Sequence, residues 1–477
     1  MTDHVIARTR AGAVRGREYD GVRQWLGVPF AAAPTGSRRF RAPEPAEPWT
    51  GERDALHVGP VAMQSREPML AGITPSTVIS EDCLSLNVYA PARGSGHPVI
   101  VWIHGGAFVM GSGSMPLYNG SSFVERHDLV VVTINYRLGL FGFSLLGDAN
   151  VGLLDQIAAL RWVQDNIAGF GGDPDRVTVM GESAGAISIA HLLTMPAAHG
   201  TFHRAILQSG AGALEPITRA EAEATTTEVL SELGATREAL ADVPAERILA
   251  VQASLMAKRG LAAIAPCVDG VAVPLAPRVA ARRGEITRVP LLAGSNRDEW
   301  NLFDLMMPQT TALVEAQLRG RIGTRADEVR AAYRSWADVA GDLVFRIPML
   351  RLVEAYPAPV YVYRFDVASP AFGGRLGAAH ALELSLVWNR LANPFSALLL
   401  GGDTKPFERV ALQMHDAWSA FAKTGSPEIA ELPAWPRYEV PRRATMIIDR
   451  DAAHVEDDAG GDQRRLWDAI LTDNRVD

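Results

Sequence analysis

The 477-residue sequence has few cysteines and no long unbroken apolar stretch. Two cysteines, Cys83 and Cys267, are too few for a disulfide framework, so we expect both to be free and buried. No run of about 18 apolar residues occurs, and we therefore expect no membrane span. The first residues, MTDHVIARTR, lack the apolar stretch of an export signal, which favours a cytoplasmic protein.

An excess of positive charge is also missing. Lys and Arg number 46 against 54 Asp and Glu, a net charge of −8, so nucleic acid is not expected as a partner. The histidines show no paired spacing typical of metal ligands, and we expect no metal. Hydrophobic residues make up 48% of the chain, which excludes a disordered protein.

Short apolar runs alternate with helical patterns along the chain. Runs rich in β-branched residues predict buried strands at 98–103, 129–134, 177–180, 205–207, 290–293 and 360–363. Periodic patterns predict helices at 150–167, 218–233 and 410–423, the second opened by a Thr218 and Glu221 capping box and stopped by Gly234. This alternation predicts the α/β class with a mostly parallel central sheet flanked by helices. We expect one domain over 1–477, with helical insertions near 215–265 and 301–352.

The segment VTVMGESAG carries a candidate nucleophile. It contains the chain's single G-x-S-x-G pattern, at Gly181, Ser183 and Gly185, between a predicted strand and a predicted helix. A serine on such a sharp turn is presented above the sheet, and the helix start points N–H groups toward it. The alternative is a glycine-rich surface turn with an incidental serine.

The segment HGGAF follows the predicted strand at 98–103 and is a candidate oxyanion hole. Small residues there leave backbone N–H groups free to stabilise a developing negative charge. The candidate donors are the N–H groups of Gly106 and Ala107, together with that of Ala184 beside the nucleophile, and His104 is interpreted as a support for the loop. A dinucleotide-binding turn is the alternative, but the G-x-G-x-x-G spacing is absent.

With these motifs the sequence resembles the type-B carboxylesterases, the α/β-hydrolase group that includes cholinesterases and bacterial p-nitrobenzyl esterases. The resemblance extends over nearly the whole chain and includes GVPFAAAPTGSRRF, SEDCLSLNVYAP, HGGAF, INYRLGLFGF, GLLDQIAALRWVQDNIAGFGGDPDRVTVMGESAG, GSNRDEW and HALELSLVW. It implies the α/β-hydrolase fold, with helical insertions forming a cleft over the nucleophile. It also implies hydrolysis of carboxylic esters through an acyl-serine, with no cofactor.

The resemblance assigns a catalytic triad. Ser183 matches the nucleophile, Glu299 in GSNRDEW matches the acid, and His380 in AAHALEL matches the base, in the chain order of α/β-hydrolases. Asp298 is the alternative acid, and Trp300 stands where the family usually has glycine.

Further residues match the family's supporting positions. Glu182 is expected as a buried carboxylate near the site. Ser209 is expected to form a hydrogen bond to the His–Glu pair, or else to be a plain strand-end serine. Two ion pairs of the scaffold are expected, Arg137 with Asp155 and Arg39 with Glu81.

Five apolar residues are candidates for lining a substrate cleft, although aromatic residues at such positions are equally typical of a core: Phe108, Met110, Trp300, Phe303 and Trp388. The expected partners are water and a small to medium, largely apolar ester, including esters of bulky alcohols, and we expect a monomer or weak homo-oligomer. An amidase, carbamate hydrolase or lactone hydrolase would use the same triad. A binding or adhesion homologue without catalysis is the alternative of another class.

Overall fold

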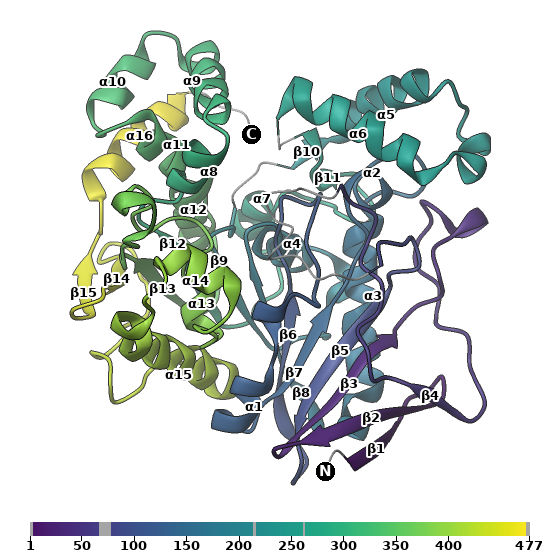
Figure 1. Ribbon diagram of the computed structural model, residues 1–477. Helices are drawn as coiled ribbons and strands as arrows, with labels where there is room; N and C mark the ends of the chain where they lie inside the picture. Colours follow the sequence, from purple (N-terminus) through teal and green to yellow (C-terminus); the bar gives the residue numbers. More distant parts are fainter. Residues whose placement is uncertain (1–2, 66–77, 213–215, 261–262, 474–477) are drawn as a thin grey trace.

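The computed structural model describes residues 3–65, 78–212, 216–260 and 263–473, and within them one large sheet dominates the fold (Figure 1). Its thirteen strands are β1 (Asp3–Arg8), β2 (Ala13–Tyr19), β3 (Val22–Pro29), β4 (Glu52–Asp54), β5 (Ser85–Pro91), β6 (His97–Ile103), β7 (Val130–Ile134), β8 (Gly172–Glu182), β9 (Arg204–Gln208), β12 (Leu291–Asn296), β13 (Val360–Phe365), β14 (Ala444–Ile448) and β15 (His454–Asp457). Their order is β1-β2-β3-β5-β7-β6-β8-β9-β12-β13-β14-β15, with β4 beside β2. A separate small pair joins β10 (Ile217–Thr218) to β11 (Cys267–Val268).

The centre of the sheet is parallel, as predicted. All six expected strands are present, and the pairs β7·β6, β6·β8, β8·β9, β9·β12, β12·β13 and β13·β14 are parallel. The sheet edges differ, because β1, β2, β3 and β5 pair antiparallel at one edge and β15 at the other. Except for the exchange of β6 and β7 and the side strand β4, strand order follows chain order.

Both faces of the sheet are covered by apolar packing. Along β6, Val101 and Ile103 belong to one core cluster, whereas Ile100 and Trp102 belong to the other. This alternation follows from the two-residue period of a strand, and it explains why the run reads as continuously apolar. Helix α3 (Val151–Asn166) contributes to the first cluster and α15 (Glu408–Thr424) to the second.

The other helices are α1 (Ser121–His127), α2 (Gly139–Gly142), α4 (Ala184–Leu192), α5 (Arg219–Leu233), α6 (Ala245–Arg259), α7 (Pro277–Arg283), α8 (Asn301–Met306), α9 (Gln309–Ile322), α10 (Arg325–Ala331), α11 (Trp336–Gly341), α12 (Ile347–Ala355), α13 (Leu384–Val387), α14 (Pro394–Leu400) and α16 (Gly461–Asp473). In Figure 1, α5 and α6 lie beyond one end of the sheet on one side, and α8 to α11 lie beyond the same end on the other. The predicted capping box of α5 is confirmed, since Thr218 and Glu221 bond reciprocally and Gly234 ends the helix at φ 61°.

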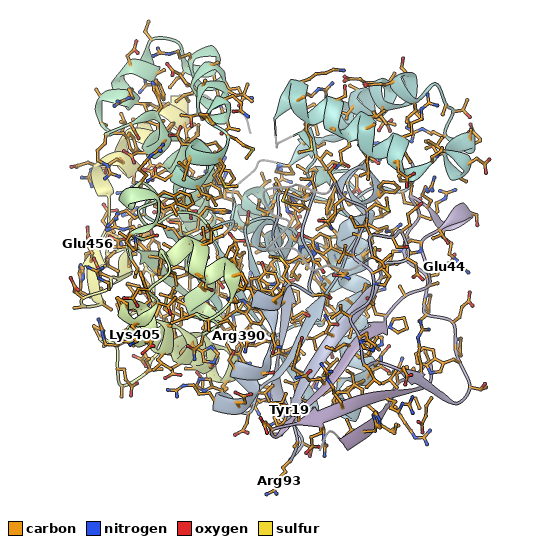
Figure 2. The ribbon with its side chains drawn as sticks, in the orientation of Figure 1. Tyr19, Glu44, Arg93, Arg390, Lys405 and Glu456 are labelled. Atoms are coloured by element: carbon orange, nitrogen blue, oxygen red, sulfur yellow. The ribbon has the colours of Figure 1, made fainter. Side chains whose placement is uncertain are left out.

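Charged side chains such as Glu44, Arg93 and Lys405 project from the periphery (Figure 2). In the described part of the chain, no helix combines the length and apolar character needed to cross a bilayer.

Candidate active site

Four loops meet at one end of the sheet, where the parallel strands terminate. Strands β6, β8, β12 and β13 belong to the parallel centre, so their carboxyl ends lie at this same end. Ser183 directly follows β8, and Glu299 lies three residues after the end of β12. The HGGAF segment follows β6, and His380 lies on the long connection after β13.

Ser183 occupies a strained turn between β8 and α4. Its backbone has φ 53° and ψ −122°, outside the regions that L-residues usually adopt. The Ser183 N–H donates to the carbonyl of Gln208 at 2.9 Å, which fixes the turn to the neighbouring strand. A Cβ at Gly185 would collide with the carbonyl oxygen of Ile103, so glycine is required there. The strand, turn and helix predicted around this serine are confirmed.

The structure brings the predicted acid and base together. His380 Nδ1 lies 2.7 Å from Glu299 Oε2, and the other Glu299 oxygen accepts the Asn296 N–H at 2.8 Å. His380 Nε2 lies 3.0 Å from Glu182 Oε1. The Ser183 hydroxyl makes no hydrogen bond to any described residue, and Glu182 Oε1 is buried without a hydrogen-bond partner among them, so the contact between Glu182 and the imidazole is one of charge alone.

The buried charges around the imidazole alter its titration. Burial lowers the pKa of His380, but the charges of Glu182 and Glu299 outweigh burial and raise it to about 9. One imidazolium cannot balance every nearby carboxylate. Burial, together with the charges of Glu383 and Glu299, therefore raises the pKa of Glu182 to about 8 despite the attraction of His380.

Sequence reasoning missed a set of polar residues behind the pair. Glu383 is fully buried and accepts hydrogen bonds from Asn296 Nδ2 at 2.6 Å and Gln208 Nε2 at 3.2 Å. Gln208 in turn accepts the Trp418 indole N–H at 3.2 Å. Burial raises the pKa of Glu383 to about 7. The sequence feature that could have identified Glu383 is its position three residues after His380, in the segment HALE.

Asp298, the alternative acid, is engaged elsewhere. Its carboxylate accepts hydrogen bonds from Arg297 Nη2 at 2.8 Å, from Arg334 Nη2 at 2.9 Å and from the Ala378 N–H at 2.9 Å. Although burial alone would raise its pKa, these hydrogen bonds lower it. The neighbouring carboxylate, Glu299, is the one that contacts the imidazole.

The predicted oxyanion donors have free N–H groups. Within the described ranges, the N–H groups of Gly106, Ala107 and Ala184 donate to no acceptor. Gly106 has φ 110°, and a Cβ there would collide with the carbonyl oxygen of Met110, so the loop needs glycine at this point.

The HGGAF loop is held against the nucleophile by its neighbours. A Cβ at Gly105 would lie 3.0 Å from Ser183 Cβ, which shows how closely loop and turn approach. The His104 ring stacks on Tyr136 with centroids 4.5 Å apart, and its Nδ1 lies 2.8 Å from the Gly105 carbonyl oxygen. Burial lowers the pKa of His104 to about 4, so this imidazole is neutral at pH 7. These contacts are those of a supporting residue.

The five candidate cleft residues separate into two groups. Phe303 is half-buried with its ring 5.1 Å from the His380 ring, Trp300 packs on Phe303 at 4.8 Å, and Met110 is half-buried. Phe108 and Trp388 are instead fully buried, Phe108 against Phe143 and Trp388 against Trp102. In this structure neither of these two side chains lines a cleft, because both are part of the core.

One supporting prediction differs from the structure. Ser209 is fully buried, but its hydroxyl has no hydrogen-bond partner among the described residues, so the bond expected with the His–Glu pair is not formed here.

The two predicted ion pairs of the scaffold are confirmed. Arg137 Nη2 lies 2.6 Å from Asp155 Oδ1, and Arg39 Nε lies 2.7 Å from Glu81 Oε2. Cys83 and Cys267 are both buried and free.

Comparison with known proteins gives a consistent family. The model of the carboxylesterase family matches residues 3–325 and 312–467. The chain is 38% identical to the para-nitrobenzyl esterase of Bacillus subtilis (strain 168), covering 97% of this chain and 98% of that protein. It is 37% identical to the phenmedipham hydrolase of Pseudarthrobacter oxydans, covering 96% and 98%. A solved structure of PNB esterase superposes with a TM-score of 0.90 at 37% identity, covering 97% of this chain and 99% of that one. The chain therefore belongs to the carboxylesterase family: it has the α/β-hydrolase fold and hydrolyses carboxylic esters.

Proposed function

We propose that this chain hydrolyses esters with Ser183 as nucleophile, His380 as general base and Glu299 as the carboxylate that orients the imidazole. The observation that carries the proposal is the 2.7 Å contact between His380 Nδ1 and Glu299 Oε2. It lies at the end of the sheet where Ser183 occupies its strained turn. The Nδ1–H group donates a hydrogen bond to Glu299. Nε2 of the neutral imidazole is therefore the basic nitrogen.

In the first half-reaction, Ser183 Oγ attacks the ester carbonyl carbon while His380 Nε2 takes the hydroxyl proton. The tetrahedral oxyanion accepts hydrogen bonds from the N–H groups of Gly106, Ala107 and Ala184. The C–O bond to the alcohol then breaks, His380 returns the proton to the leaving oxygen, and an acyl-serine remains. Water repeats the sequence, releasing the acid and restoring the serine.

Glu182 is a second carboxylate beside the imidazole. Its Oε1 lies 3.0 Å from Nε2 without a hydrogen-bond partner among the described residues, so Glu182 acts on the base through its charge. Glu182 thus stabilises the protonated base, and activity is expected to fall in acid, where His380 is charged.

The test is Ser183→Ala, assayed with p-nitrophenyl acetate, with Ser231→Ala on the exposed face of α5 as matched control. We expect kcat of Ser183→Ala to fall about 1000-fold or more, with the control unchanged. An organophosphate should label the wild-type protein once per chain at Ser183. Turnover retained in Ser183→Ala refutes the nucleophile assignment, and absence of both turnover and labelling in the wild type favours a binding homologue.

The proposed substrates are small to medium, largely apolar esters. Trp300 and Phe303 supply apolar surface beside His380, and Met110 lies against Gly106 of the HGGAF loop. That loop resembles the oxyanion signature of relatives with an open alcohol side. A panel varying acyl and alcohol groups separately, with matched amides, carbamates and lactones, tests this proposal. A preference for any of those three classes over esters would favour the alternative hydrolase, a possibility raised by the relative named for phenmedipham hydrolysis.

The oligomeric state and location belong to the same proposal: a monomer or weak homo-oligomer in the cytoplasm. Sedimentation over a range of protein concentrations tests the first, and fractionation of the source cells tests the second.

A further inference from the structure

A single π-helical turn, η8 (Asp342–Arg346), joins α11 to α12 beside the acid and base. It is defined by the Ile347 N–H, which donates to the Asp342 carbonyl five residues earlier. The next residue is Pro348, which has no N–H and whose ring would clash with the preceding turn of an α-helix. Widening to a π-turn relieves that clash, and such turns are frequent at functional sites.

The turn η8 packs against the base, and the glycine just before it approaches the acid. Its buried Phe345 places its ring 4.7 Å from the His380 ring at an interplanar angle of 37°. The ring of Phe303 lies 5.1 Å from the same imidazole, and the two phenyl rings stack 6.2 Å apart as an aromatic wall. Just before η8, a Cβ at Gly341 would lie 3.6 Å from Glu299 Cβ.

Contacts from distant segments hold η8 in place. Arg346 Nε bonds Asp342 Oδ1 at 2.6 Å across the turn, and Arg346 Nη1 donates to the Ala459 carbonyl at 3.0 Å. Asp342 also accepts the Tyr333 hydroxyl at 2.5 Å, and that hydroxyl accepts the Trp467 indole N–H of α16 at 2.7 Å.

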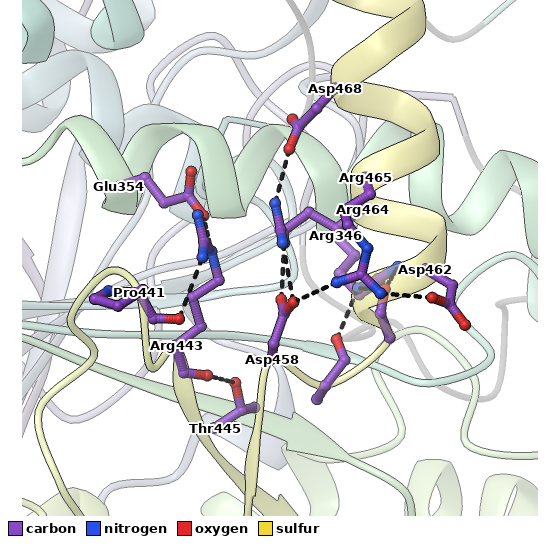
Figure 3. Close-up of polar contacts among 12 residues, drawn as sticks. Arg346, Glu354, Pro441, Arg443, Thr445, Asp458, Asp462, Arg464, Arg465 and Asp468 are labelled. Carbon is purple, nitrogen blue, oxygen red and sulfur yellow. Dashed lines mark hydrogen bonds and ion pairs between the residues drawn. The ribbon is translucent and has the colours of Figure 1, made fainter.

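Residues 458–460, which we term the C-terminal turn, supply the carbonyl oxygen that accepts the hydrogen bond from Arg346, and further contacts hold this turn in place (Figure 3). Arg464 donates two hydrogen bonds to Asp458, at 2.7 and 2.9 Å, and one to Asp468 at 2.8 Å. Gly460 has φ 68°, and a Cβ there would lie 2.8 Å from Arg346 Nη1. The turn therefore needs glycine for the close approach of the guanidinium.

We propose that Phe345 is a positioning residue for the His380 imidazole, and that the C-terminal turn anchors the η8 turn that carries it. The inference rests on the proposed function, in which Nε2 takes the Ser183 proton while Nδ1 stays bonded to Glu299. The aromatic wall covers one side of the imidazole, restricting its tilt and keeping water from the Nδ1–H bond. The charged groups that face the imidazole, Glu182, Glu299 and Glu383, are untouched by changes at Phe345.

The experiment compares Phe345→Leu, Phe345→Tyr and Arg346→Met with Phe421→Leu. Phe421 on α15 is fully buried and packs against Tyr361, so its variant controls for loss of a core ring. The readouts are kcat and KM for p-nitrophenyl acetate, and the far-downfield proton resonance of Nδ1–H held by a carboxylate. Circular dichroism checks that each variant is folded.

We expect Phe345→Leu to lower kcat about 10- to 100-fold with little change in KM, and to broaden the downfield resonance through faster exchange with water. Phe345→Tyr keeps the ring face and should recover most of kcat, whereas Arg346→Met should shift both readouts in the direction of Phe345→Leu by a smaller amount. If Phe345→Leu does not fold, Phe345→Tyr against Arg346→Met supplies the same comparison.

Wild-type kcat and an unchanged resonance in Phe345→Leu, or equal losses in Phe421→Leu, would overturn the inference. Those results leave the proposed function intact as long as Ser183→Ala is inactive. An active Ser183→Ala would instead refute the proposed function itself.

Discussion

Replacing Glu182 by glutamine should move the pH dependence of catalysis to lower pH. The limb of kcat/KM that rises with pH follows loss of the proton from the free enzyme's imidazole. In the wild type the pKa of His380 is raised to about 9, so activity should still be rising above neutral pH. Glu182→Gln keeps the side-chain shape but removes the charge that lies 3.0 Å from Nε2.

The size of the shift follows from this geometry. With an effective dielectric of about 20, unit charges 3.0 Å apart attract by roughly 332/(20 × 3.0), or about 5 to 6 kcal/mol, an upper limit of about 4 pKa units. The pKa of Glu182 is itself raised to about 8, so this carboxyl is only partly ionised over the lower part of the rising limb. We therefore expect the rising limb to move down by about 1–3 pH units, the range seen for one opposite charge at close contact.

The assay is the initial rate of p-nitrophenyl acetate hydrolysis from pH 5 to pH 10, read where the acid and anion of the product absorb equally. Ionic strength is held constant because salt screens charge interactions. Glu125→Gln, on the exposed side of α1, is the matched control and should leave the limb in place. A limb that stays fixed in Glu182→Gln, or moves to higher pH, would refute the reasoning.

Three further predictions concern the scaffold. Arg137→Leu leaves the fully buried Asp155 without its partner and should lower the free energy of unfolding by about 3–5 kcal/mol in urea titration; a loss below about 1 kcal/mol would contradict the buried-pair argument. Gly185→Ala forces a Cβ into the Ile103 carbonyl and should abolish organophosphate labelling, whereas normal labelling would show that the turn tolerates a side chain. Thr218→Ala removes the capping box of α5 and should cost about 1 kcal/mol by the same titration, and an unchanged midpoint would show that the cap is dispensable.

The sequence predicted the centre of the fold better than its edges. The β6 run is apolar on both faces and matches the predicted 98–103 strand closely, because a strand buried in a parallel sheet shows no polar face. The antiparallel edge was not predicted. In β2, Arg15 and Arg17 alternate with the buried Val14 and Gly16. An alternation over so few residues is difficult to distinguish from a loop.

At the site, the motifs identified residues but not their surroundings. Asp298 and Glu299 are adjacent carboxylates, and only the path of the chain after β12 decides which one meets His380. Phe345 comes from a helical segment 35 residues before that histidine, and nothing in its local pattern predicts the contact. Aromatic character alone also cannot separate a cleft wall from a core, which is why Trp388 was a candidate.

The near-sequential strand order has a practical consequence. Strands β1 to β9 form one contiguous part of the sheet and β12 to β15 the other, with α5 and α6 in the connection between β9 and β12. A nick between α5 and α6 would put Ser183 in one fragment and both Glu299 and His380 in the other. Neither fragment could turn over substrate by itself. The colour released from a chromogenic ester would therefore report how many fragment pairs had assembled by pairing β9 with β12.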